Sequence, residues 1–251
     1  MIYIDGDSCM AGSGIHQEMY GFKRYYTGKE LIPRLKNGKT LEFNKKMHKR
    51  RDKDPSLAYK IAKAEQLDNV SSQLIKKQIN LTSRASGGSS NQAICSRIID
   101  AVINNNAKTV FFSPTTLSRM VYPRPGSQSL TFGQLNDYNP AYTKFLQSWI
   151  EIIGVNQTQY LEVNALYGLI NFCKDNNIEL VGISTPLWKH QLERQYPQEI
   201  RRTLDKINEI CILNMGSSLD DNTERLYTEC GHPNLECHTR LAEDICTHLK
   251  K

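Results

Sequence analysis

The sequence predicts an α/β protein whose parallel sheet is covered by helices on both faces. Three apolar segments of strand character, at residues 1–4, 108–113 and 178–184, are separated by segments with apolar residues at helical spacing. Strands that alternate with helices favour parallel pairing, because each helix can return the chain across one face of the sheet. The chain has 251 residues, 39% of them hydrophobic, which is enough for one core. We therefore expect one domain over residues 1–251, with an insertion at about 22–53.

Each expected element has its own signal along the chain. The first strand is MIYI, the second is KTVFFS and the third is IELVGIS. Helical periodicity occurs at residues 56–67, 93–105, about 141–176 and 235–251. We expect an interruption of the third helical region near Gly154, because glycine weakens a helix interior. In the last helix, Leu241, Ile245 and Leu249 form one apolar stripe.

The composition argues against a membrane protein and against a disulfide framework. No apolar run approaches the roughly 20 residues that cross a bilayer, and the chain starts on a strand-like segment without a charged and apolar leader. The seven cysteines are odd in number and include no Cys-x-x-Cys spacing, which favours reduced thiols. These features predict a cytoplasmic protein, unless a virion or a leaderless route carries it out of the cell.

The positive charge of the chain is local. The net charge is +6, yet residues 22–53 alone hold twelve Lys/Arg against three Asp/Glu. This basic stretch also carries Phe22, Tyr25, Tyr26 and Phe43. Basic segments with interleaved aromatic residues can hold phosphates or nucleic acid. A solvated insertion kept soluble by its lysines, or a lid that selects acidic substrates, explains the same composition.

A serine follows the first strand directly, in the stretch DGDSCMAGSG. In a parallel sheet, ligands bind beyond the carboxyl ends of the strands, so Ser8 is expected at the functional edge. Backbone amides that follow it can face a ligand there. The alternative is structural: Asp7 or Ser8 caps a helix through SGIHQEMYGF.

A serine nucleophile needs a base, and the base needs an orienting acid. Near the C-terminus, the stretch TECGHPNLECHTRLAEDI places Glu229 three residues before His232, across a turn that contains Gly231. This spacing can bring the carboxylate back to one imidazole nitrogen while the other faces outward. His238 lies inside the last helix, where we expect a packing or hydrogen-bonding role.

A glycine pair precedes the helix at 93–105, in the stretch INLTSRASGGSSNQAI. Gly87 and Gly88 allow the backbone to approach a ligand closely, and N–H groups at such a place can stabilise an oxyanion. Ordinary N-capping by Ser90 or Asn91 explains the residues that follow. The two interpretations are compatible.

Taken in order, these three stretches resemble the SGNH, or GDSL-type, hydrolase family, and most closely its compact version often seen in phage genomes. The resemblance implies a flavodoxin-like three-layer α/β/α domain of about five parallel strands in the order 2-1-3-4-5. It also implies ester hydrolysis by a serine nucleophile, which would be Ser8. The acid and base carry over to Glu229 and His232, and the oxyanion donors to the amides of Ser8 and Gly88. A phage-encoded protein would reside in the host cytoplasm or in the virion.

Two positions depart from the family pattern. Glu229 stands where the family usually has aspartate, so its longer side chain must fold back further. The Gly-x-Asn-Asp motif expected after the second strand is replaced by SPTTLSRMVYPRPG, which lacks the oxyanion asparagine. Asn91, Thr115 and Thr116 are candidates for the missing donor. Arg119 and Thr115, which both lie in this stretch, are candidates for substrate binding. The guanidinium of Arg119 can hold an anionic group of a substrate.

Two other chemistries fit the sequence less well. Cys230, His232, Cys237 and His238 are close together, but their spacing does not match the Cys-x2-4-Cys or His-x3-5-His pattern of zinc sites. Cys9, beside Ser8, is a second candidate nucleophile, although the family register puts the serine at the reactive position. We expect no metal or cofactor, and a small-molecule or glycan ester as the substrate. The alternative function is a non-hydrolytic protein of the same fold that holds nucleic acid or another polyanion.

Overall fold

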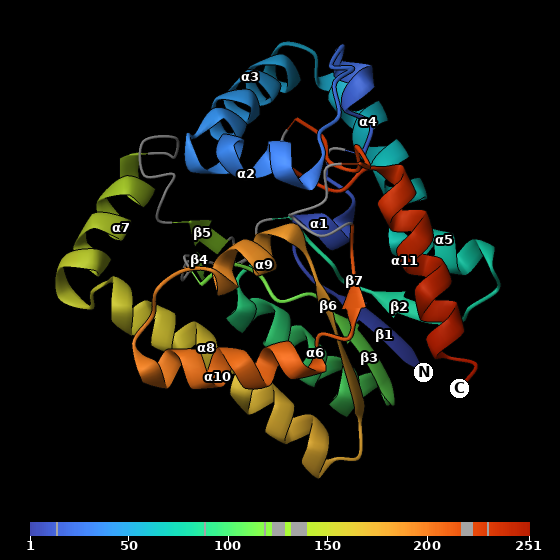
Figure 1. The fold of residues 1–251 in the computed structure, drawn as a ribbon, viewed down its shortest axis with the longest axis vertical. Helices are drawn as coiled ribbons and strands as arrows, with labels where there is room; N and C mark the ends of the chain where they lie inside the picture. Colours follow the sequence, from blue (N-terminus) through green and yellow to red (C-terminus); the bar gives the residue numbers. More distant parts are fainter. Residues whose placement is uncertain are drawn as a thin grey trace.

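Five parallel strands form the central sheet of the structure, which is a computed structural model (Figure 1). The structure describes residues 1–13, 15–87, 89–117, 119–121, 129–131, 140–216, 223–229 and 231–251. From one edge to the other, the strands are β2 (Leu81–Ser83), β1 (Ile2–Asp5), β3 (Thr109–Phe112), β6 (Glu179–Ser184) and β7 (Leu213–Asn214). Counted along the chain, this is the predicted order 2-1-3-4-5.

Helices connect the strands and cover the sheet. Apart from the sheet, β4 (Arg119–Val121) and β5 (Ser129–Thr131) form an antiparallel pair. The helices are α1 (Ser8–Ala11), the 3₁₀ helix η1 (Gln17–Tyr20), α2 (Gly28–Lys36), α3 (Lys39–Lys53), α4 (Pro55–Asp68), α5 (Val70–Lys76), α6 (Asn91–Asn105), α7 (Pro140–Ile152), α8 (Val155–Asp175), α9 (Pro186–Leu192), α10 (Gln198–Ile210) and α11 (Leu235–His248).

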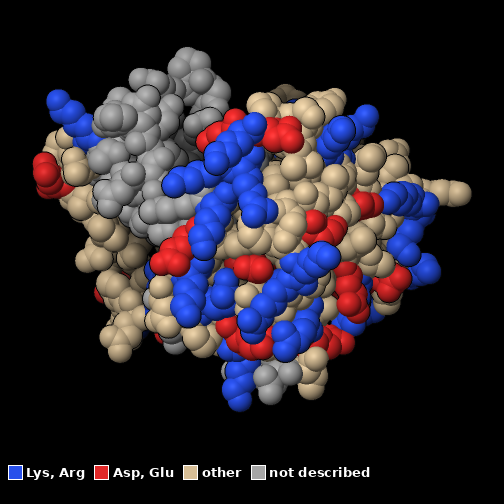
Figure 2. Space-filling model, turned by 90° about the horizontal axis from the view of Figure 1, so that it is seen from above, with Lys and Arg blue, Asp and Glu red and all other residues tan. Residues whose placement is uncertain are grey.

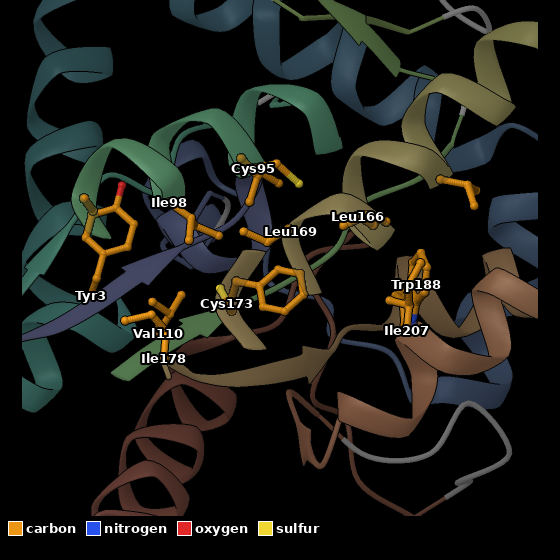
Figure 3. Close-up of a cluster of buried hydrophobic side chains, with 14 of the residues drawn as sticks. Tyr3, Cys95, Ile98, Val110, Leu166, Leu169, Cys173, Ile178, Trp188 and Ile207 are labelled. Atoms are coloured by element: carbon orange, nitrogen blue, oxygen red, sulfur yellow. The ribbon is translucent and has the colours of Figure 1, made fainter. Parts of the chain in front are cut away.

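The side chains of the central strands divide between two cores because successive residues of a strand point to opposite faces. Tyr3, Val110 and Phe112 belong to one core, with side chains from α6, α8 and α10 (Figure 3). Ile4 and Phe111 belong to the other, with side chains from α1, α5 and α11. Both faces of β1 and β3 are therefore buried, which explains why these strands read as unbroken apolar runs. The predicted three-layer α/β/α class is confirmed.

The helical predictions agree with the structure in most places. The helix expected at 56–67 is α4, and the one expected at 93–105 is α6. The interruption at Gly154 is present: this residue has a φ of 82° and separates α7 from α8. Leu241 and Ile245 of α11 are fully buried. Among the described residues of the region SGIHQEMYGF, the structure has only a short 3₁₀ helix, and the helix that Asp7 caps is the four-residue α1.

The basic stretch at residues 22–53 contains α2 and α3, which lie near α1 beyond the carboxyl ends of the strands (Figure 1). Tyr26 and Tyr227 form an isolated antiparallel bridge. Arg225 donates to the carbonyl oxygen of Tyr25 at 3.0 Å and pairs with Glu30 at 3.2 Å. Figure 2 shows Lys and Arg side chains spread over the upper face of the molecule, with Asp and Glu among them. The basic stretch is thus docked on the chain segment just before His232.

Two further expectations concern the whole chain. Within the described ranges, we find no helix whose length and apolar character would suit a membrane span. Six cysteines lie in the described part of the chain, and all six are free thiols. Burial raises the pKa of the Cys237 thiol to about 12 and that of the Cys173 thiol to about 11.

Candidate active site

Ser8 and His232 meet at the carboxyl end of β1. The two residues are 224 positions apart in the chain, and Ser8 Oγ lies 2.7 Å from His232 Nε2. The strand ends at Asp5, Asp7 caps the short helix α1, and Ser8 is the first helical residue. Because β1 lies between β2 and β3 in the sheet, the loops after three neighbouring strands converge on this point.

A closed turn positions His232. Gly231 has a φ of 85°, and its N–H donates to the carbonyl oxygen of Thr228 at 3.0 Å. The N–H and the hydroxyl of Thr228 both donate to the carbonyl oxygen of His232, each at 2.9 Å. Asn234 then caps α11 by accepting from the N–H of Cys237 at 3.2 Å. The imidazole therefore projects from a loop whose backbone hydrogen bonds are made on both sides of it.

Glu229, the predicted acid, lies in the same turn. Its Oε2 atom is 3.9 Å from Arg34 Nη2 on α2, and its side chain is 21% exposed. Its backbone N–H donates to Gln17 Oε1 at 2.6 Å, and the Gln17 amide donates in turn to the carbonyl oxygen of Arg24. These contacts join the Glu229 turn to η1 and α2. The role of Glu229 toward His232 stays a prediction.

Gly87, the first glycine of the second stretch, lies beside Ser8. A Cβ atom built on Gly87 would be 3.8 Å from the Cβ of Ser8. The N–H of Ser86 donates to the carbonyl oxygen of Gly6 at 3.1 Å, which fixes this loop against the loop after β1. Gly88, the predicted oxyanion donor, lies outside the described residues. Ser90 caps α6, since its hydroxyl accepts from the N–H of Ala93 at 3.2 Å.

Asn91 connects the second stretch to the loop after β3. Its Oδ1 accepts from the N–H of Thr115 at 2.8 Å, and its Nδ2 donates to the carbonyl oxygen of Thr115 at 3.1 Å. Its own backbone N–H donates to Glu162 Oε2 at 2.6 Å. Asn91 is fully buried. The amide therefore ties two loops together, and its part in an oxyanion hole stays a prediction.

Thr115 and Arg119, the predicted substrate-binding residues, both contact Asp7. The Thr115 hydroxyl donates to Asp7 Oδ2 at 2.9 Å, and Arg119 Nη1 donates to the same oxygen at 3.1 Å. Arg119 Nη1 also donates to the carbonyl oxygen of Ser89 at 3.0 Å. From the sequence, Asp7 was expected only as a possible helix cap. Its partners are 108 and 112 positions away in the chain, so no local sequence pattern predicts these contacts.

His238 lies behind the site as a structural residue. It is fully buried, and its Nδ1 atom accepts from the N–H of Val70 at 3.1 Å. Burial, together with the smaller effect of the nearby His232, lowers the pKa of its imidazole to about 3. His238 is therefore neutral over the physiological range, as the expected hydrogen-bonding role requires. Among the described residues, no group of three or more potential metal ligands occurs. Cys230 lies outside the described residues.

Comparison with known proteins gives structural neighbours only. No protein-family model and no curated protein matches the chain. A solved structure described as a lipolytic protein of the G-D-S-L family, from Desulfitobacterium hafniense DCB-2, is 10% identical, with a TM-score of 0.43; 98% of this chain and 97% of that chain are covered. A psychrotrophic esterase from Pseudoalteromonas sp. is 12% identical, with 99% and 96% covered and a TM-score of 0.38.

A GDSL-like lipase from Bacteroides thetaiotaomicron VPI-5482 is also similar, at 10% identity and a TM-score of 0.37, with 99% of this chain and 88% of that chain covered. Two of these three descriptions name the family that the motifs resemble.

Proposed function

We propose that this chain is an SGNH-type serine hydrolase that cleaves short-acyl carboxylic esters. The observation that carries the proposal is the 2.7 Å contact between Ser8 Oγ and His232 Nε2 at the carboxyl end of a central strand. A serine hydroxyl becomes a nucleophile when a base within hydrogen-bonding distance can accept its proton. The position after β1 is also where a parallel α/β sheet binds its ligands.

In the proposed reaction, the Ser8 hydroxyl transfers its proton to His232 Nε2 while its oxygen attacks the ester carbonyl carbon. The resulting oxyanion accepts hydrogen bonds from the N–H groups of Ser8 and Gly88. The ester C–O bond then breaks, and His232 gives its proton to the departing alcohol. Water attacks the acyl-enzyme with His232 as the base again, which releases the acid and restores Ser8. Glu229 orients His232 and stabilises its charged form.

The first prediction concerns the length of the acyl group. With p-nitrophenyl esters, we expect kcat/KM to be highest for acetate and to fall steadily toward octanoate and dodecanoate. Gly87, which lies beside Ser8, has no side chain, and the sequence has no long apolar segment that would line a tunnel for a long acyl chain. Steady-state kinetics on the purified full chain measure this series. A maximum at eight or more carbons would contradict the short-acyl proposal.

The second candidate function is polyanion binding by the basic stretch, and the exposed lysines of α3 favour it. Lys46, Lys49 and Lys53 are exposed, and the upper face of the molecule carries many cationic side chains (Figure 2). By contrast, Arg50 is engaged within the fold: it donates to the carbonyl oxygen of Tyr20 and stacks on Phe22. Exposed lysines can release counterions from a nucleic acid, whereas a guanidinium held by the fold contributes less.

Neutralising these three lysines separates the two functions. If α3 binds nucleic acid, the triple variant Lys46→Gln, Lys49→Gln, Lys53→Gln loses salt-dependent retention of DNA and keeps its ester hydrolysis. We expect the hydrolase result: little DNA retention in the wild type and unchanged kcat/KM for a neutral ester. The matched control removes three exposed charges elsewhere, at Lys108, Lys250 and Lys251. Fluorescence polarisation at 50 and 200 mM salt measures binding.

A further inference from the structure

Asp7 is a buried carboxylate next to the proposed nucleophile, and three groups converge on it. Its side chain is 1% exposed. Its Oδ1 atom accepts from the N–H of Cys9 at 2.9 Å, which caps the helix that starts at Ser8. Its Oδ2 atom accepts from the Thr115 hydroxyl and from Arg119 Nη1. One oxygen of Asp7 therefore holds the turn that carries Ser8, and the other is held from a different loop.

The same contacts join the loops after three strands. Asp7 belongs to the loop after β1, and Thr115 follows β3. Arg119 Nη1 bridges Asp7 Oδ2 and the carbonyl oxygen of Ser89, which lies in the loop after β2. Asn91 adds its pair of hydrogen bonds to the Thr115 backbone. A shift of any one of these loops would strain contacts to the other two.

We infer that Asp7 is a positioning residue for Ser8, and that Thr115 and Arg119 hold Asp7 in place instead of binding substrate. This inference rests on the proposed hydrolase function. Arg119 is only 12% exposed, and its Nη1 atom already serves two acceptors. Moving the guanidinium toward a substrate anion would leave the buried Asp7 carboxylate without its cation, which is strongly unfavourable. The contacts thus favour a fixed Arg119.

The expected consequence for catalysis is specific. Serine attack requires the nucleophile and the reacting carbon to be aligned within a fraction of an ångström, so a looser Ser8 turn lowers the rate of the chemical step. Substrate affinity depends on other contacts and changes little. Loss of Asp7 or of its partners should therefore appear in kcat, with KM close to the wild-type value.

The test is a double-mutant cycle of Asp7→Asn, Arg119→Gln and their combination, measured with a neutral acetate ester and with a succinyl ester of the same alcohol. We expect each single variant to lower kcat by about 10 to 100-fold on both esters, with KM within about twofold. The kcat of the double variant should lie within about twofold of the kcat of the slower single variant, because both changes break the same linked set of contacts. Arg119→Lys should recover part of the loss.

Leu204→Ala is the control for general destabilisation, since Leu204 lies fully buried on α10, in the same core as Tyr3 and Val110. It should lower the melting temperature and leave kcat near the wild-type value at a temperature where all variants are folded. If the wild type is active, any of three results overturns the inference. The first is that the losses in the double-mutant cycle are additive, and the second is that Arg119→Gln raises KM for the succinyl ester alone. The third is that the kcat values of Asp7→Asn and Arg119→Gln equal that of Leu204→Ala. A wild type inactive on every ester overturns the hydrolase proposal itself.

Discussion

Replacing Ser8 by alanine is expected to lower kcat/KM for p-nitrophenyl acetate by at least about 1,000-fold. Removal of a serine nucleophile leaves only what the oxyanion donors and substrate binding provide, and triad members act as one unit. His232→Ala should cause a loss of the same order, because Ser8 Oγ and His232 Nε2 are 2.7 Å apart and the proposed attack needs His232 to accept the serine proton. Initial rates over background hydrolysis, measured with matched protein concentrations, give the ratio.

The control for this experiment is the neighbouring thiol. Cys9→Ser nearly keeps the size of the side chain and removes the thiol that the sequence offered as a second candidate nucleophile. Cys9 is fully buried on the α11 side of the sheet, so we expect this variant to retain most of the activity. Equal activity of Ser8→Ala and the wild type would exclude Ser8, and a loss confined to Cys9→Ser would point to the thiol.

The fold could be predicted to the extent that its strands are buried on both faces. Residues 1–4, 108–113 and 178–184 correspond to β1, β3 and β6, the three central strands, whose apolar runs are unmistakable. The two edge strands, β2 and β7, have three and two residues and carry no such run. Edge strands have one strand neighbour and less buried surface, so their local sequence is less constrained. Their number and order followed from the family resemblance.

The site divides in the same way between local and distant features. The turn around His232 could be anticipated, because Gly231, Pro233 and Asn234 are turn and cap residues within a short stretch. The partners of Asp7 could not be anticipated, because hydrogen bonds between loops depend on how the sheet brings the loops together. Arg119 was recognised as functional from the family pattern, but its ion pair with Asp7 is visible only in three dimensions.

Glu162 is a buried carboxyl group that no local pattern in the sequence marks as functional. It lies on α8 and is fully buried, and its Oε2 accepts from the N–H of Asn91 at the start of α6. Burial raises the pKa of Glu162 from 4.5 to about 8, while the hydrogen bonds from the N–H groups of Asn91 and Gln92 act in the opposite direction. The folded protein therefore keeps this group protonated at neutral pH.

Glu162 should make the protein less stable as the pH rises. The unfolded chain releases this proton near pH 4.5, whereas the folded chain releases it near pH 8. Between these two pH values, the folded state binds more protons at Glu162 than the unfolded state does. The free energy of unfolding is therefore highest below about pH 4.5 and falls as the pH rises to about 8. Glu162→Gln removes the titration and keeps an oxygen that can accept from the N–H of Asn91.

We therefore expect Glu162→Gln to change the free energy of unfolding little at pH 4.5 and to raise it by about 2 to 4 kcal/mol at pH 8. Urea denaturation at pH 4.5, 6 and 8 measures the difference. Glu151→Gln, an exposed carboxylate on α7, is the matched control and should show no such trend. A difference between Glu162→Gln and the wild type that is constant from pH 4.5 to 8 would mean that Glu162 is already ionised in the folded protein. In that case, its charge would serve as a permanent cap of α6, the helix that follows the proposed oxyanion loop.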